Sequence, residues 1–330
     1  MFPGYRCRFD NIKTKDFQFF TQKKEYTDDS ILTIATADWL LHGGTSGGAY
    51  YRYACQYPYP IGSYGTMFVQ WIHKARRGIV EPYNSCGNGS AMRVGPVGWA
   101  FETEQETLDA AKCSAECTHN HPEGIKGAQA TALCIYLARN GVTSNEIRKR
   151  IENDFGYNLS LTVNEIRPRY SWEGLDGNVN GGTCQGSVPQ AITCALEATG
   201  FEDAIRNAIS IGGDSDTIGC ITGGIAEALY GISDDIRQKG KKLFFYTRYN
   251  LEKHRNDIEI DFLLSNDSKT NMKIIPIEVK SSQNYSSISL DKFRGIYKHR
   301  ISESVIIHPK NIVIEEDLIR IPPYMFFAAF

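Results

Sequence analysis

Apolar residues recur at helical spacing through most of the first 240 residues, separated by polar and glycine-rich segments. Ile147 and Ile151, for example, lie four residues apart on one face of an amphipathic segment. This spacing, together with the residues at the segment ends, predicts helices over 30–41, 107–115, 122–140, 144–155, 188–199, 201–210 and 216–229. Because no series of strand-like alternation occurs there, we expect an all-α domain with glycine-rich loops at 43–48, 87–98, 179–186 and 212–213.

The pattern of residues changes near position 242. Of the chain's 30 glycines, only Gly295 lies beyond residue 240, and β-branched runs over 258–264 and 273–279 predict strands. Two short strands over 304–307 and 311–314 and a helix over 289–298 complete a small α/β domain. We therefore predict two domains, 1–242 and 243–330.

The overall composition is ordinary for a globular protein, with 42% hydrophobic residues, 22% charged residues and a net charge of −2. This charge gives no electrostatic reason to expect binding to nucleic acid or to an anionic membrane. The longest apolar runs are too short for a membrane-spanning helix of about 20 residues, and the opening residues do not form a secretory signal. Nine cysteines without a CxxC pair predict reduced thiols, so we expect a cytoplasmic protein.

Two acidic clusters lie far apart in the sequence, and each opens an apolar helix. One is Thr27-Asp28-Asp29, and the other is Asp214-Ser215-Asp216-Thr217. A hard divalent cation needs several oxygen ligands, which carboxylates and hydroxyls supply. Brought face to face, the two clusters could hold two cations. The alternative is that each cluster only caps its helix, because Asp, Ser and Thr are also preferred at helix N-termini.

Two further segments suggest a bound ligand. The loop 87–93 offers backbone N–H groups, the Ser90 hydroxyl and the Arg93 side chain, and such loops can hold phosphate. His119 stands just before the long helix predicted over 122–140, where it either contacts a ligand or caps that helix. A third glycine-rich segment, 182–189, leads into another helix.

In their order along the chain, these segments resemble the ADP-ribosylglycohydrolase family, of the dinitrogenase-reductase-activating glycohydrolase type. The resemblance covers about residues 4–240. It rests on residues 11–17, Thr27-Asp28-Asp29, the loop 87–93, Thr118-His119-Asn120, residues 186–189, and residues 204–207 running into 212–217.

This resemblance implies an all-α fold that binds two Mg²⁺ (or Mn²⁺) ions. The implied metal ligands are Thr27, Asp28, Asp29, Asp214, Asp216 and Thr217. The implied contacts to ADP-ribose are Gly87, Asn88, Gly89, Ser90 and His119. The implied reaction is hydrolysis of the N- or O-glycosidic bond between ADP-ribose and a protein side chain or small conjugate. Asp28 or Asp216 would accept the proton of the attacking water.

The chain departs from the family pattern at its start. Family members usually begin with a helix that carries a Gly-Asp pair, followed by a Glu close to the metal site. We expect that helix to be missing here, and Arg8 takes the position of the Glu. Because a cation there would oppose metal binding, an alternative is a protein that binds ADP-ribose but does not hydrolyse its conjugates.

The second domain carries its own candidate site. Asp261 lies on one predicted strand, and Glu278 and Lys280 lie at the end of the next. This arrangement is typical of PD-(D/E)xK nucleases, whose carboxylates bind a metal ion. Through residues 275–281 and 321–325, the domain resembles the C-terminal domain of prokaryotic ATPases of unknown function, although the chain has no P-loop motif. We expect a degenerate or accessory domain, with a DNA-acting nuclease as the alternative.

Overall fold

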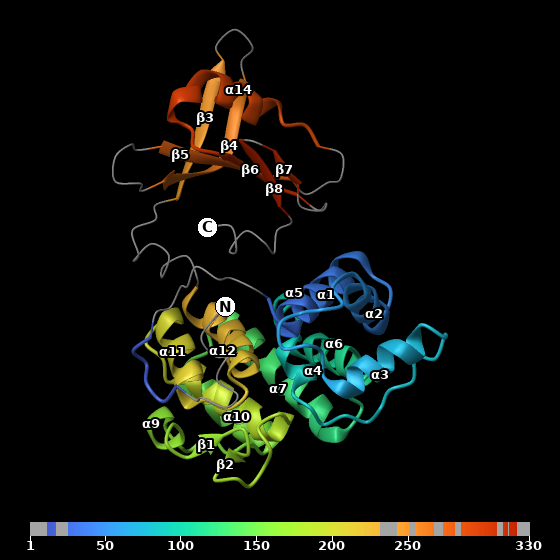
Figure 1. Cartoon of the computed structure of the whole chain (residues 1–330). Helices are drawn as coiled ribbons and strands as arrows, with labels where there is room; N and C mark the ends of the chain where they lie inside the picture. The colour runs from blue at the N-terminus through green and yellow to red at the C-terminus, as the bar shows by residue number, and fades with distance from the viewer. Residues whose placement is uncertain are drawn as a thin grey trace. The chain divides into compact units, whose positions relative to one another are not determined.

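A computed structural model of the chain describes residues 12–17, 26–231, 243–250, 255–266, 273–280, 285–308, 313–315 and 317–321. The chain divides into two compact units, residues 1–232 and 233–330. Unit 1 consists mainly of helices, and unit 2 contains a sheet (Figure 1). This agrees with the fold predicted for each part. The domain boundary at residue 242 stays a prediction, because residues 232–242 lie outside the described part.

Unit 1 confirms the predicted, mostly helical architecture. Its helices are α1 Asp28–His42, α2 Ser46–Gln56, α3 Thr66–Ala75, α4 Gly89–Met92, α5 Val97–Ala100, α6 Glu104–Glu116, α7 Pro122–Arg139, α8 Ser144–Phe155, α9 Val163–Ile166, α10 Cys184–Leu196, α11 Phe201–Ile211 and α12 Ser215–Tyr230. A two-stranded antiparallel hairpin, β1 Tyr170–Ser171 and β2 Gly174–Leu175, lies between α9 and α10.

Helix α8 illustrates how local sequence determines these helices. The Thr143 side chain accepts a hydrogen bond from the Glu146 amide, and the Glu146 side chain accepts one from the Thr143 amide. Ile147 and Ile151 are both fully buried, as their spacing predicts. The helix ends at Gly156, whose φ of 64° lies in the left-handed region that glycine favours.

The long helix α7 runs through the core of unit 1 and packs against α6, α10 and α12. A Cβ atom at Gly127 would lie 2.4 Å from the Cys184 sulfur, so the close contact of α7 with α10 requires glycine there. The start of α10 also joins the loop 87–93, because Cys184 donates its amide to the Cys86 carbonyl at 2.9 Å. This packing places the loop near His119, which lies just before the start of α7.

The sequence patterns did not predict α2 and α3, nor the four-residue helices α4, α5 and α9, of which α4 and α5 lie in the expected loop 87–98. The expected glycine-rich loop at 43–48 already enters α2 at Ser46, because the Thr45 side chain caps the helix through the Gly48 amide. Gly47 is helical, and a Cβ atom there would lie 3.3 Å from the Cys117 Cβ. Likewise α10 begins at Cys184, before the predicted start at 188, since Thr183 caps it through the Gly186 amide.

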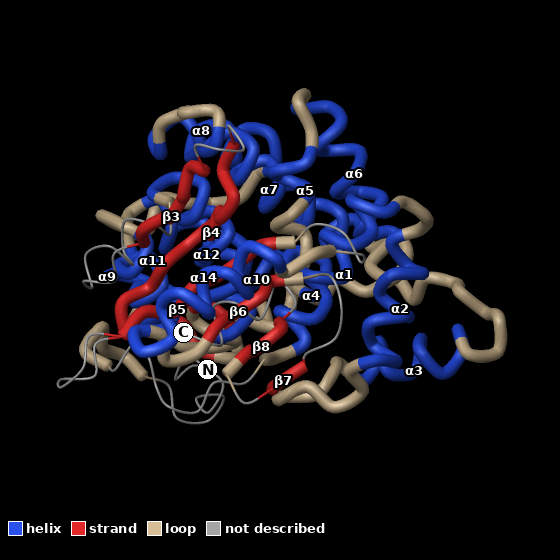
Figure 2. Tube along the Cα trace, turned by 90° about the horizontal axis from the view of Figure 1, so that it is seen from above, coloured by secondary structure: helices blue, strands red, loops and turns tan. Residues whose placement is uncertain are grey.

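Unit 2 contains a six-stranded mixed sheet with the strand order β3-β4-β5-β6-β8-β7 (Figures 1 and 2). The β5–β6 and β6–β8 pairs are parallel, and the other neighbours are antiparallel. Helix α14 packs on the sheet through Leu290 and Phe293, which join Ile258, Ile260 and Ile306 in one core. The elements are β3 Leu243–Asn250, β4 Arg255–Asn266, β5 Lys273–Val279, α14 Ile288–Tyr297, β6 Ser304–Ile307, β7 Val313–Glu315 and β8 Leu318–Ile321. Strands β3 and β8 were not predicted.

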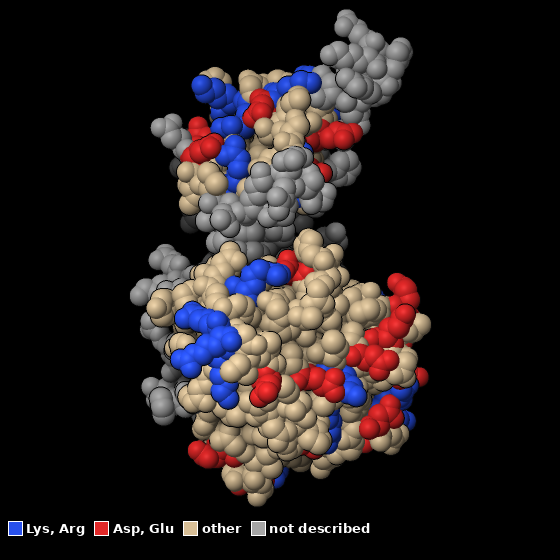
Figure 3. Space-filling model, turned by 90° about the vertical axis from the view of Figure 1, so that its right-hand side faces the viewer, with Lys and Arg blue, Asp and Glu red and all other residues tan. Residues whose placement is uncertain are grey.

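The surface carries charges of both signs. On the face drawn in Figure 3, acidic and basic side chains both occur on each unit. Among the described residues, no helix is both long enough and apolar enough to cross a bilayer.

Candidate functional site

A cavity of about 580 Å³ opens in unit 1, lined by residues from several separate parts of the chain. These are the start of α1, the segment 62–68, the loop 87–93, the residues around His119, and the start of α12 with the hairpin before α10. The lining residues that the sequence analysis proposed for function are Asp28, Gly87, Asn88, Gly89, Arg93, His119, Asp214, Asp216 and Thr217. This volume lies within the range of cavities that hold small molecules and cofactors.

The two acidic clusters converge at one end of this cavity. Asp28 from the first cluster lines it together with Asp214 and Asp216 from the second. Helices α1 and α12, which begin at these clusters, pack against each other. Asp29 is only 3% exposed, and it accepts a hydrogen bond of 2.7 Å from the Thr27 hydroxyl. Helix packing thus gathers carboxylate and hydroxyl oxygens from both clusters.

Neither N-cap residue of these two helices makes the side-chain hydrogen bond that defines a cap. The Thr27 hydroxyl bonds to Asp29, and Asp214 accepts from the Asn88 side-chain amide at 2.8 Å. The explanation that these clusters only cap helices therefore does not account for the contacts of Thr27 and Asp214.

The carboxylates of the two clusters raise one another's pKa values. Burial raises the pKa of Asp28 well above its usual value, and the charges of Asp29, Asp216 and Asp214 raise it further. Burial and the charge of Asp216 raise the pKa of Asp29 to about 7, despite its bonds to Thr27 and Thr217. Burial and Asp216 also raise the pKa of Asp214 well above the ordinary value. Such a group of acids favours either protons or a bound cation.

The chemistry of these donors fits a hard divalent cation. Asp29 Oδ1 is buried and has no hydrogen-bond partner among the described residues, which is costly unless something else binds it. All of the candidate ligands are oxygen atoms, as Mg²⁺ and Mn²⁺ prefer. Within the described part of the chain, no three His, Cys, Asp or Glu side chains are already arranged to hold one metal ion.

The loop 87–93 and His119 form the neighbouring wall. Asn88 donates its side-chain amide both to Asp214 and, at 3.3 Å, to the Gly181 carbonyl. It therefore ties the loop to the end of the cavity where the two acidic clusters lie, called the acidic end below. A Cβ atom at Gly89 would lie 3.1 Å from His119 Nε2, and one at Gly87 would lie 3.5 Å from it. Glycine at both positions therefore leaves the imidazole edge open to the cavity.

Unlike Gly87, Asn88 and Gly89, Ser90 does not line the cavity. Its side chain is fully buried, and its hydroxyl donates to the Gly124 carbonyl at 2.7 Å, which anchors α4 against α7. The structure thus directs the Ser90 hydroxyl away from the cavity to which the sequence analysis assigned it.

Sequence reasoning missed the aromatic part of the cavity, formed by Tyr64, Phe68, Tyr83 and Trp172. A weak signal existed in the segment Gly62-Ser63-Tyr64-Gly65, whose glycines and positive-φ Ser63 mark a tight turn. Trp172 carried no such signal, because it reaches the cavity only through the short hairpin β1–β2.

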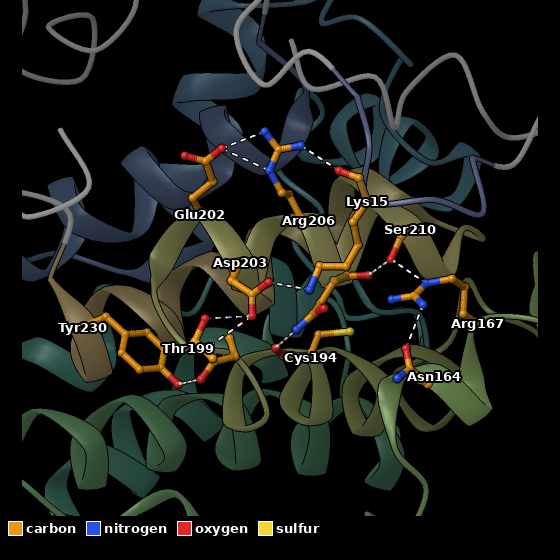
Figure 4. A network of polar contacts seen from close by, with 12 residues as sticks. Lys15, Asn164, Arg167, Cys194, Thr199, Glu202, Asp203, Arg206, Ser210 and Tyr230 are labelled. Carbon is orange, nitrogen blue, oxygen red and sulfur yellow. Dashed lines mark hydrogen bonds and ion pairs between the residues drawn. The ribbon is translucent and has the colours of Figure 1, made fainter. Parts of the chain in front are cut away.

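The N-terminal segment 12–17 lies against α11, as the contacts in Figure 4 show for Lys15. Arg206 donates to the carbonyls of Lys15 and Phe17 at 2.7 and 2.9 Å, and Lys15 pairs with Asp203. The Lys13 ammonium donates to the Ile211 carbonyl at 2.6 Å and also to the Tyr170 carbonyl. This segment therefore holds the end of α11, directly before the turn that carries Asp214. Arg8, which takes the position of the family's Glu, lies outside the described residues.

The second candidate site lies in unit 2. Lys280 Nζ is 3.2 Å from Glu278, a buried residue, and Asp261 accepts a hydrogen bond of 2.7 Å from the Val279 amide. Burial raises the pKa of Glu278, and the charge of Asp261 adds to this rise, whereas Lys280 opposes it. Strands β4 and β5 thus bring all three predicted residues together.

Comparison with known proteins matches most of the chain to one family. The model of the family described as ADP-ribosylglycohydrolase matches residues 4–258, and a domain of unknown function, DUF4143, matches residues 226–325. The DUF4143 match says nothing of nuclease chemistry, so the nuclease resemblance stays a prediction.

Three curated relatives support the family match. Mouse ADP-ribosylhydrolase ARH3 is 31% identical over 265 residues, which cover 64% of this chain and 71% of the mouse protein. Human ADP-ribosylhydrolase ARH3 is 30% identical over 263 residues, 64% of this chain and 72% of the human protein. ADP-ribosylarginine hydrolase Tri1 of Pseudomonas putida is 25% identical over 245 residues, 63% of this chain and 60% of its own length. The chain therefore belongs to the ADP-ribosylglycohydrolase family of hydrolases.

Proposed function

We propose that the cavity in unit 1 hydrolyses the N- or O-glycosidic bond between ADP-ribose and a protein side chain or small conjugate, with two Mg²⁺ (or Mn²⁺) ions. The observation that carries this proposal is the convergence of two partly buried acidic clusters at one end of a cavity. The names of the mouse and Pseudomonas relatives support the ADP-ribosyl part of the substrate.

Each residue of the acidic end has a proposed role. The ligands to the ions would be Thr27, Asp28, Asp29, Asp214, Asp216 and Thr217. When bound, the ions would supply Lewis-acid chemistry that orients the ribose hydroxyls and activates water. Asp28 and Asp216 both line the cavity, so either carboxylate can accept the proton of the attacking water. Nearby carboxylates also offset the positive charge that develops on the ribose as the bond breaks.

The remaining walls would hold the nucleotide. Gly87, Asn88 and Gly89 bring backbone and amide groups to the cavity, and His119 faces the same space. Tyr83 and Trp172 add half-buried aromatic rings, which suit stacking with an adenine base. The polar loop and the acidic cluster are linked by the Asn88–Asp214 bond, so both ends of a bound ADP-ribose would be positioned together.

The test is release of free ADP-ribose from peptides modified on arginine or on serine, measured with the full chain and Mg²⁺. We expect release by the wild type, a loss of about 100-fold or more in Asp28→Asn, and no change in Asp109→Asn. Asp109 lies exposed on α6 and provides the matched control.

Calorimetry with ADP-ribose separates this proposal from its alternative. Binding of ADP-ribose without release from either peptide would support a non-catalytic ADP-ribose-binding protein, which the Arg8 substitution motivates. Absence of both binding and release would refute the proposed function.

A nuclease activity of unit 2 is a second candidate, supported by the grouping of Asp261, Glu278 and Lys280. Glu278 is buried and paired with Lys280, and Asp261 is already engaged by the Val279 amide. These contacts favour the degenerate or accessory domain. Mg²⁺-dependent DNA cleavage that disappears in Lys280→Ala would support the nuclease instead.

A further inference from the structure

A chain of buried polar contacts leads from Arg93 to the edge of the cavity. The Arg93 side chain is fully buried, and its guanidinium donates to the Ser114 carbonyl at 3.0 Å and to the Thr118 hydroxyl oxygen at 2.8 Å. The Thr118 hydroxyl oxygen in turn lies 2.8 Å from His119 Nδ1. Thr118 is also fully buried, and His119 is only 6% exposed. Water therefore does not compete for these bonds.

The direction of each hydrogen bond follows from the chemistry of the groups. A guanidinium can only donate, so one lone pair of the Thr118 oxygen accepts from Arg93. The Thr118 hydroxyl then has one proton to donate. Its neighbours include His119 Nδ1 at 2.8 Å and the Cys117 sulfur at 4.0 Å. The bare nitrogen of an imidazole is a much stronger acceptor than a thiol sulfur, so the proton of the Thr118 hydroxyl goes to His119 Nδ1.

The positive charge of Arg93 also favours a neutral His119 imidazole. Arg93 has no ion pair with any residue that the structure describes, and its guanidinium stacks 3.8 Å from the centre of the Tyr50 ring. Burial and this nearby positive charge lower the pKa of His119 well below its usual value, so the imidazole stays neutral. A neutral imidazole carries one proton, and with Nδ1 accepting, that proton must lie on Nε2.

Nε2 is the atom that faces the ligand space. His119 lines the cavity, and Gly87 and Gly89 lack the side chains that would come within 3.5 and 3.1 Å of Nε2. We propose that Arg93 and Thr118 are positioning residues that hold His119 as the neutral Nε2–H tautomer. His119 then offers one hydrogen-bond donor and no acceptor to the cavity. It would select a ligand that brings an acceptor oxygen to the loop 87–89, and it would reject a ligand that brings only a donor there.

The inference rests on the proposed function only for the identity of the ligand, ADP-ribose. The tautomer itself can be read without any ligand, from long-range ¹H–¹⁵N correlation spectra of the full chain labelled with ¹⁵N-histidine. The chain contains seven histidines, and the spectrum of His119→Gln identifies the signals of His119. We expect a protonated Nε2 and an unprotonated Nδ1 between pH 8 and pH 6. A protonated Nδ1 in the wild type would overturn the proposal.

Two variants of Thr118 test the relay itself. Thr118→Val keeps the shape of the side chain but removes the hydroxyl, so we expect a mixture of His119 tautomers and about 10-fold weaker binding of ADP-ribose in calorimetry. Thr118→Ser restores the hydroxyl and should restore both the spectrum and the affinity. An unchanged His119 spectrum in Thr118→Val would also overturn the proposal. If the wild type has the expected tautomer but binds no ADP-ribose, the proposed function fails while the tautomer assignment stands.

Discussion

The side-chain amide of Asn88 donates to the Asp214 carboxylate at 2.8 Å, which joins two residues 126 positions apart in the chain. This bond connects the loop 87–93 to the acidic end of the cavity. It also opposes, though it does not cancel, the rise in the pKa of Asp214 that burial and Asp216 cause. Asn88 is therefore placed to control both the position and the charge of Asp214.

Replacement of Asn88 by aspartate tests this relationship. Asn88→Asp keeps the shape but turns a donor into another carboxylate that faces Asp214, so we expect a lower Tm at pH 8 without metal. One lost hydrogen bond to a charged group is worth about 2 kcal/mol, or roughly 4–8 °C in a unit of this size. Thermal denaturation measures the change, with the exposed Asn158→Asp as the control. Equal Tm values for both variants would contradict the role of Asn88.

Neutralising Asp29 should have opposite effects with and without a metal ion. Asp29 has one buried oxygen without a partner, and its carboxylate repels Asp216. Without metal, Asp29→Asn removes repulsion, so the Tm should stay equal or rise. With millimolar Mg²⁺ or Mn²⁺, the wild type should gain stability through binding and the variant should gain much less. Calorimetric melting in EDTA and in each metal distinguishes these cases, and Asp109→Asn should behave as the wild type. Equal gains in wild type and Asp29→Asn would contradict a ligand role for Asp29.

The buried His119 should make stability depend on pH. Burial and Arg93 lower its pKa well below 6.5 in the folded chain, whereas the unfolded chain keeps an ordinary value. As the pH falls below 6.5, the unfolded chain therefore binds a proton that the folded chain does not. The free energy of unfolding then decreases by up to about 1.4 kcal/mol per pH unit until the folded pKa is reached.

Urea denaturation at pH 7.5 and pH 5.5 measures this effect. His119→Gln should lose less stability than the wild type over this interval, because its side chain does not titrate. His42 lies exposed at the end of α1, so His42→Gln should follow the wild type. If His119→Gln and the wild type showed the same pH dependence, His119 would bind its proton over the same pH range in the folded and the unfolded chain, which contradicts the prediction.

Lys13 should stabilise the turn before Asp214. Its ammonium donates to the Ile211 and Tyr170 carbonyls, and burial lowers its pKa. Gly213, with a φ of 71°, packs so closely on Tyr170 that a Cβ atom would lie 2.4 Å from the ring. Lys13→Met keeps the length of the side chain but removes the donors, so we expect a loss of about 2 kcal/mol in the free energy of unfolding.

The same variant should also reduce Mg²⁺-dependent ADP-ribose release more than its stability loss explains, because Asp214 follows the turn that Lys13 holds. Lys112→Met is the control, since Lys112 is exposed on α6 and pairs with Glu116 one helical turn away. Urea denaturation and the release assay at a temperature where both proteins are folded separate the two effects. Unchanged stability in Lys13→Met would mean that segment 12–17 does not hold α11.

The sequence by itself determined the helices whose signals are local. Helix α8 lies over the predicted range because Thr143, Glu146 and Gly156 provide its ends and Ile147 and Ile151 its buried face. Such helices can be predicted because a cap, a turn or a periodic apolar face depends on residues only a few positions apart. The family motifs also pointed to Asp28, Asp214 and Asp216, which line the cavity, although their roles stay predictions.

Tertiary structure alone decided how these pieces act together. The starts of α1 and α12 meet because the two helices pack against each other, which no local pattern encodes. Ser90 could have faced a ligand, yet the packing of α4 on α7 turns its hydroxyl toward Gly124. Each of these outcomes depends on contacts between distant segments, and the burial that such contacts create determines which polar groups find a partner and which stay available for a ligand.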